Sequence, residues 1–138
     1  MRDWLPVILW MAAIFWGSSR STLPGPLGVQ SAGGDWLRNA THMAEYAILA
    51  ALTHRALRQT SAAARRALSF PSHFSFLIPM LFPLLFALSD EWHQSFVPGR
   101  QCTLADLALD AAGAALGLLA IRLCQRLSER LQPVDLVP

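Results

Sequence analysis

The chain has 138 residues, 54% of them hydrophobic and 14% charged, and its mean hydropathy of +0.37 is typical of a membrane protein rather than a soluble one. Its formal charge of +2 is too small and too scattered for a nucleic-acid-binding protein, so that class is excluded. No long polar tract is present to form a separate soluble domain. The sequence therefore predicts a single domain over residues 1–138.

Two apolar segments occupy the first half of the chain. The first, residues 4–17, contains no charged side chain, although about 14 helical residues span only about 21 Å of a hydrocarbon core about 30 Å thick. Bulky Phe15 and Trp16 stand where small residues precede a signal-peptide cleavage site, so we expect a retained membrane helix. A loop rich in Ser, Gly and Pro follows, and a second helix is predicted over residues 40–57.

Two more apolar segments occupy the second half, after an arginine-rich connector. A third helix is predicted over residues 70–92, and a fourth, rich in Ala and Gly, over residues 104–124. The predicted fold is therefore all-α, a polytopic membrane bundle of about four transmembrane helices.

One face of the predicted fourth helix combines carboxylates with glycines. Asp106, Asp110, Gly113 and Gly117 recur at i, i+4, i+7 and i+11. The GxxxG spacing allows a neighbouring backbone to approach closely, so we expect this face to pack within the bundle, and an oligomeric partner would also bind here. By the same geometry the two carboxylates point into the bundle rather than toward lipid.

The arginines predict the orientation in the membrane. All 11 basic residues are arginines, and with four spans eight of them lie on the side of the N-terminus. The positive-inside rule then places both termini in the cytoplasm and the run from Asp90 to Arg100 on the outer side. The eight are Arg2, Arg55, Arg58, Arg65, Arg66, Arg122, Arg126 and Arg130.

Polar residues from three predicted helices are expected to meet near the outer side. Helical spacing places four residues of the second helix on a single stripe at i, i+3, i+4 and i+7: His42, Glu45, Tyr46 and Leu49. On the third helix it pairs Asp90 with Gln94. Because an unpaired carboxylate in hydrocarbon costs several kcal/mol, such residues indicate a functional site. The predicted site comprises His42, Glu45, Tyr46, Asp90, Glu91, Gln94, Arg100, Asp106 and Asp110.

Several of these residues also have a purely structural interpretation. Thr103 and Asp106 have the spacing of a capping box. Asp110, one turn deeper, requires Arg100, His42 or a proton as its partner. Arg100 follows a Pro-Gly turn that would hold its guanidinium near the surface, where it either binds a phosphate or carboxylate or neutralises a neighbouring acid.

A metal site is a competing interpretation. His42 and Glu45 at i, i+3, joined by Asp90 and Glu91 from another helix, are residue types that ligate metals in bundle cores. The spacing alone is weak support, because a neutral His hydrogen-bonded to Glu in a buried network is commoner. We therefore expect neither a metal nor another cofactor.

The polar motif reads His42-x-x-Glu45-Tyr46, then Ser89-Asp90-Glu91-x-x-Gln94-x-x-x-Pro98-Gly99-Arg100-x-x-Thr103-x-x-Asp106, then Gly113 and Gly117. It resembles the VanZ-like family of small bacterial membrane proteins, and the end of the first helix, Phe15-Trp16-Gly17-Ser18-Ser19, is similar too. The resemblance covers most of the chain. It implies a multi-pass, all-helical protein of the bacterial cytoplasmic membrane in a family named for a determinant of teicoplanin resistance.

Two positions depart from that family. Members often carry a Lys shortly before the His, where this chain has Asn39, and an Asn where it has Asp110. These departures argue against a mechanism that needs the Lys, and they add negative charge to the site.

The residues and the resemblance together predict an outward-facing pocket for an anionic lipid or a lipid-linked envelope precursor. Arg100 would hold the anionic head, Gln94 would orient it, and Asp90 and Glu91 would position donors or exchange protons. The alternatives are a membrane enzyme that modifies such a lipid, with His42 or Glu91 as general base, and a lipid flippase or transporter. The candidate catalytic residues are His42, Glu45, Asp90 and Glu91.

Overall fold

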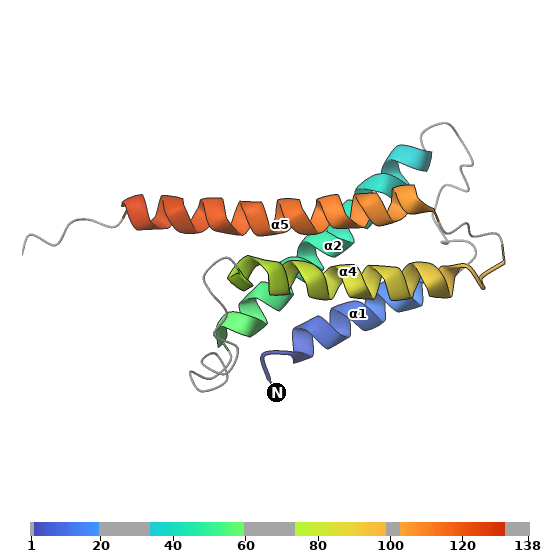
Figure 1. Cartoon of the computed structure of the whole chain (residues 1–138), viewed down its shortest axis with the longest axis horizontal. Helices are drawn as coiled ribbons and strands as arrows, with labels where there is room; N and C mark the ends of the chain where they lie inside the picture. Colours follow the sequence, from blue (N-terminus) through green and yellow to red (C-terminus); the bar gives the residue numbers. More distant parts are fainter. Residues whose placement is uncertain (1, 20–33, 60–73, 99–102, 132–138) are drawn as a thin grey trace, which may run out of the picture.

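The computed structural model describes residues 2–19, 34–59, 74–98 and 103–131. Within these ranges the chain forms four helices and no strand, so the all-α prediction is confirmed for the described part (Figure 1). The helices are α1 (Leu5–Ser18), α2 (Gly34–Gln59), α4 (Phe74–Gln94) and α5 (Leu104–Leu131).

Two helices are longer than their apolar segments predict. α2 begins at Gly34 rather than at residue 40, and α5 ends at Leu131 rather than at residue 124. The additional turn and a half of α2 is largely polar, and the added turns of α5 consist mostly of Leu, Arg, Gln and Glu, which favour helix whether or not they are buried. Hydropathy therefore identified the apolar stretch of each helix and missed its polar end.

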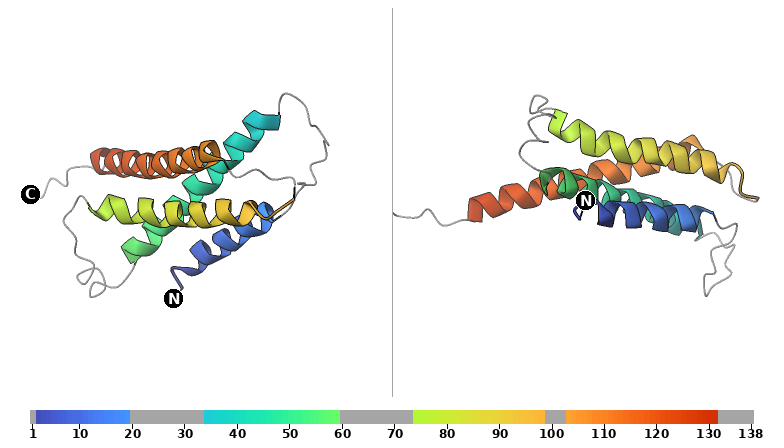
Figure 2. Two further views of the ribbon diagram at one scale, coloured as in Figure 1. Left: turned by 45° about the vertical axis from the view of Figure 1, so that its right-hand side comes forward. Right: turned by 90° about the horizontal axis from the view of Figure 1, so that it is seen from below.

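The direction of the chain alternates from one helix to the next. As a result α1 and α4 end, and α2 and α5 begin, at the same end of the bundle (Figure 1). α2 lies across the bundle and contacts each of the other three helices, most extensively α5 (Figure 2). Since α2 and α5 run in the same direction, residues near their two N-termini face each other.

Two glycines of α5 allow α2 to approach closely. A Cβ atom added to Gly113 would clash with the carbonyl oxygen of Met43, and one added to Gly117 would lie 2.5 Å from the carbonyl oxygen of Ala47. The close backbone approach predicted from the GxxxG spacing is thus made by α2 of the same chain. An oligomeric partner at this face would have to displace α2.

The distribution of polar side chains is inverted relative to a soluble bundle. Within the described ranges, eight polar or charged residues are buried in the interior, whereas the outer faces of the helices carry large apolar side chains. α5 is long and apolar enough to cross a membrane, and α1 is apolar but shorter. Exposed side chains on α4 include Leu77 (47%), Leu81 (55%), Leu85 (57%) and Leu88 (51%).

Candidate functional site

Buried polar side chains gather at the end of the bundle where α2 and α5 begin. The structure thus brings together seven of the nine residues that the sequence predicted to meet, and it adds Ser18 from α1. Every residue of the group, backbone and side chain together, is at most 7% exposed. We call this group the polar cluster; it consists of Ser18, His42, Tyr46, Asp90, Glu91, Gln94, Asp106 and Asp110.

Asp90 is held by two neutral donors. Ser18 Oγ donates to Asp90 Oδ2 at 2.6 Å, and Gln94 Nε2 donates to the same oxygen at 2.9 Å. The other oxygen, Oδ1, is buried and has no hydrogen-bond donor among the described residues, and none of these places a cation within ion-pair distance of Asp90. This carboxylate therefore has one oxygen still available to a ligand.

His42 and Asp110 form a buried pair between α2 and α5. His42 Nδ1 lies 2.9 Å from Asp110 Oδ1, and the side chains are 9% and 1% exposed. Of the partners expected for Asp110, the structure selects His42. Because an ionised carboxylate only accepts, the hydrogen of this bond belongs to Nδ1 whenever Asp110 is charged, which leaves Nε2 of the imidazole for another contact.

Asp106 is hydrogen-bonded to Thr103, the residue that caps α5, and it is also an ion-pair partner. Thr103 Oγ1 donates to Asp106 Oδ2 at 2.7 Å and accepts from the Asp106 backbone N–H at 3.1 Å, which confirms the predicted capping interaction. Asp106 Oδ1 lies 3.3 Å from a guanidinium nitrogen of Arg38, whose side chain is 49% exposed. Arg38 was not predicted to belong to the site, because the second helix was expected to begin at residue 40. The i, i+4 spacing from Arg38 to His42 could have indicated it.

The end of α1 closes one side of the polar cluster. Ser19 Oγ lies 3.1 Å from His93 Nε2, and the rings of Phe15 and His93 stack with centroids 4.2 Å apart. Together with the Ser18–Asp90 bond these contacts fix α1 to α4. The Ser18-Ser19 pair was noted in the sequence only as part of the family resemblance, since its partners lie more than 70 positions away in the chain.

The surroundings of the three remaining candidate residues differ. Tyr46 is 1% exposed, and its hydroxyl has no hydrogen-bond partner within the described part of the chain. Glu45 is only half-buried, and its carbonyl oxygen accepts a hydrogen bond from Trp10 Nε1 at 2.9 Å. Arg100 lies outside the described residues.

Three ionisable members of the polar cluster have the arrangement of a metal-ligand set. His42, Glu91 and Asp110 each offer one ligand atom, and these three atoms all lie within 4.8 Å of one another. They come from α2, α4 and α5. The set differs from the one weighed in the sequence, because Asp110 takes the place of Glu45 and Asp90.

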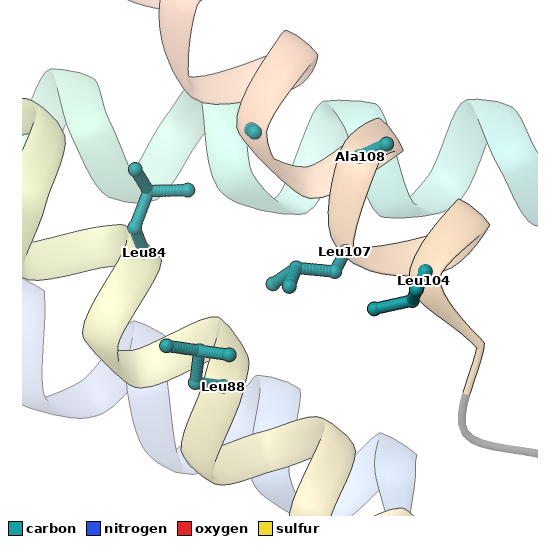
Figure 3. Close-up of a pocket in the computed structure, with 6 residues that line it drawn as sticks. Leu84, Leu88, Leu104, Leu107 and Ala108 are labelled. Atoms are coloured by element: carbon teal, nitrogen blue, oxygen red, sulfur yellow. The ribbon is translucent and has the colours of Figure 1, made fainter.

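An apolar groove lies between α4 and α5 near the polar cluster. Its volume is about 330 Å³, and its lining is wholly aliphatic (Figure 3). The groove reaches the first turn of α5, which also carries Asp106 and therefore the Arg38 ion pair. The lining residues are Leu84, Leu88, Leu104, Leu107, Ala108 and Ala111.

No curated protein and no solved structure matches the chain. The model of the VanZ/LLP1 family matches residues 4–125, which include all four helices except the last turns of α5. The match agrees with the resemblance seen in the polar motif. The chain therefore belongs to the VanZ/LLP1 family.

Proposed function

We propose that this chain is a multi-pass protein of the bacterial cytoplasmic membrane that binds an anionic lipid or a lipid-linked envelope precursor beside the polar cluster. The observation that carries the proposal is the apolar groove between α4 and α5, which ends at the level of the Arg38–Asp106 ion pair. A lipid has an acyl chain next to an anionic head, which suits an apolar groove next to a guanidinium.

The inverted distribution of side chains supports four membrane spans. At about 1.5 Å per residue, α2, α4 and α5 are about 39, 32 and 42 Å long, which is enough for a hydrocarbon core of about 30 Å. α1, at about 21 Å, requires local thinning or help from its flanking residues. Both termini are then cytoplasmic, the whole chain is one domain, and the polar cluster belongs to the outer half of the membrane.

In this proposal the acyl chain lies against the leucines of the groove, and the head is held at the rim by Arg38 and Arg100. The buried carboxylates of the polar cluster would repel an anionic head, so the head remains at the surface rather than entering the interior. Gln94 and the buried carboxylates would then contact only uncharged donor groups of the head that reach inward from the rim.

The test compares lipids that co-purify with the wild-type chain, Ala111→Phe and Ala112→Phe in a mild detergent. Ala111 lines the groove, whereas Ala112 is exposed on the same helix and is not part of the groove. We expect Ala111→Phe to lose most of the bound lipid, as measured by mass spectrometry, and Ala112→Phe to retain it. Equal recovery from all three proteins would refute groove binding.

Substitution of the two arginines tests how the head is held. Arg38→Ala and Arg100→Ala should each reduce recovery of anionic lipids more than recovery of zwitterionic lipids, because a guanidinium pairs with a phosphate or a carboxylate. If recovery from either variant equals that of wild type, that arginine does not bind the head.

The His42–Asp110 pair favours an enzyme as the second candidate. An imidazole oriented by a carboxylate is a common arrangement for a general base. If the chain modifies its lipid, purified protein will change the mass of an added envelope lipid, and Glu91→Gln or His42→Gln will stop the change. A wild-type protein that leaves every such lipid unaltered would remove this candidate.

A further inference from the structure

We infer that His42, Glu91 and Asp110 form a binding site for a first-row divalent cation such as Zn²⁺ inside the polar cluster. The inference concerns this chain's own side chains and does not depend on lipid binding. It revises the expectation, drawn from spacing alone, that the chain holds no metal.

The geometry of the three side chains is close to that of a coordination site. Ligand atoms bound to one Zn²⁺ at about 2.0–2.2 Å lie roughly 3.4 Å apart in a tetrahedral arrangement. The three ligand atoms here, one from each side chain, lie within 4.8 Å of one another. Rotation of the side chains can bring the ligand atoms from 4.8 Å to about 3.4 Å, so the three helices need not move.

Two unsatisfied polar atoms in the same cluster point independently to a bound ligand. The Tyr46 hydroxyl and Asp90 Oδ1 are buried, on side chains 1% and 3% exposed, and neither has a hydrogen-bond partner within the described residues. Tyr46 lies one turn after His42 on the same face of α2, and its ring centroid is 6.4 Å from that of Phe86, which lies one turn before Asp90 on α4. The hydroxyl is therefore directed into the cluster.

A hydrated cation would satisfy both atoms. A water molecule bound to the metal donates to a carboxylate such as Asp90 Oδ1 and accepts a hydrogen bond from a phenol such as Tyr46. Buried polar atoms are nearly always paired in native structures. Two polar atoms that the described residues leave unpaired, in the cluster that holds the three potential metal ligands, therefore indicate that a polar species binds there.

The charge of the polar cluster also favours a cation. Four buried carboxylates lie within it, and among the described residues Asp90 receives hydrogen bonds only from the neutral Ser18 and Gln94. A buried charge is stabilised by a paired charge or by a metal. One divalent cation shared by Glu91 and Asp110 would add two positive charges to a cluster whose ion pair with a guanidinium, Arg38 with Asp106, lies at the rim.

The donor set selects the class of metal. An imidazole nitrogen suits Zn²⁺ and its first-row neighbours, whereas Mg²⁺ and Ca²⁺ prefer sites made only of oxygen. A single His with two carboxylates, and a fourth position open for water, is the composition of an accessible Zn²⁺ site rather than a closed structural one.

Calorimetric titration of ZnCl₂ into the chelator-treated, detergent-purified full chain tests the inference. Both cysteines are first replaced by serine, because Cys124 is exposed and binds Zn²⁺ through its thiolate. We expect one equivalent of Zn²⁺ to bind, at least tenfold more tightly than Mg²⁺. His42→Gln and Glu91→Gln should each weaken Zn²⁺ binding at least 100-fold and abolish the rise in Tm that Zn²⁺ causes.

His54→Gln is the matched control, because His54 lies on the same helix, is half-buried and belongs to no ligand set among the described residues. It should bind Zn²⁺ like the parent. Equal affinity in His42→Gln and His54→Gln, or no saturable binding by the parent, would overturn the inference. Should one ligand variant fail to fold, the other still decides.

The lipid experiment separates this inference from the proposed function. Ala111→Phe alters the groove and none of the three ligands, so it should lose lipid and keep its Zn²⁺ affinity. Loss of Zn²⁺ binding in that variant would contradict a metal site that is independent of the groove.

Discussion

The two halves of the α2–α5 contact are built from different chemistry. Near the N-termini the helices meet through charged side chains, Arg38 with Asp106 and His42 with Asp110. Both pairs join residues 68 positions apart in the sequence, since 106 − 38 and 110 − 42 are equal. Parallel helices in fixed register repeat the same contact one turn later.

Farther along, the same helices meet through backbone. Gly113 faces the backbone of Met43, and Gly117 faces that of Ala47, both pairs 70 positions apart. The glycine half fixes the distance between the helices, because a backbone cannot rotate out of the way as a side chain can. The charged half uses that distance to place its pairs within bonding range. The geometry of the polar cluster therefore depends on two glycines that carry no functional group themselves.

The largest expected effect comes from breaking one member of the buried pair. His42→Leu leaves the Asp110 carboxylate without its partner and should lower the free energy of unfolding by about 3 kcal/mol. Unfolding by SDS in mixed micelles measures this loss. The double variant His42→Leu, Asp110→Leu removes both groups and should recover most of the stability; a double variant as unstable as the single one would contradict a pairing interaction.

Adding one methyl group to the glycine half should have the next largest effect. Gly113→Ala places a Cβ against the Met43 carbonyl and should cost about 2 kcal/mol, because two packed backbones must separate. Gly17→Ala is the control, since a Cβ at Gly17 meets nothing within 4 Å and gains helix propensity. Thermal unfolding in detergent compares the two, and equal Tm values would mean that the glycines do not set the spacing.

Spacing along the helices was enough to predict most of this site. Residues at i, i+4 share a face, so His42 with Tyr46 and Asp106 with Asp110 could be placed together from the sequence. Glu45 was predicted to belong to this group, but its side chain does not share the buried face. At about 100° per residue it lies about 60° around the helix from His42, and it is only half-buried.

What could not be predicted depends on packing between helices. The Ser18–Asp90 bond exists because α1 lies beside α4, and no periodicity within either segment encodes that contact. The four helices were predictable because each contains an apolar segment. The polar first turns of α2, which carry Arg38, were not predicted, because hydropathy identifies only apolar residues. Tertiary position, rather than residue type, separates the residues found from those missed.

A smaller effect should follow from uncoupling α1 from the charged half. Ser18→Ala removes a donor from a buried carboxylate and should lower the free energy of unfolding by about 1.5 kcal/mol. Ser19→Ala, on the exposed neighbour, should change it by less than about 0.5 kcal/mol. Chemical unfolding of both variants measures the difference, and a Ser19 effect as large as the Ser18 effect would show that the Asp90 bond is not the cause.

The smallest expected effect concerns the rim of the charged half. Arg38→Ala breaks an ion pair whose arginine side chain is 49% exposed, so the loss should be below about 1 kcal/mol. Raising NaCl from about 0.05 M to about 0.5 M should remove most of the difference between variant and wild type, since screening acts on exposed charges. A difference that persists unchanged in high salt would indicate that Arg38 acts through packing.

The length of α5 makes access to the buried pair one-sided. Asp110 follows Leu104 by six residues, so the pair lies about 9 Å from the start of the helix. If α5 spans the membrane as proposed, the pair lies within one leaflet, and roughly 20 Å of the hydrocarbon core separates it from the opposite surface. In the proposed orientation, the protonation state of the His42–Asp110 pair should therefore respond to the pH outside the cell and not to the pH of the cytoplasm.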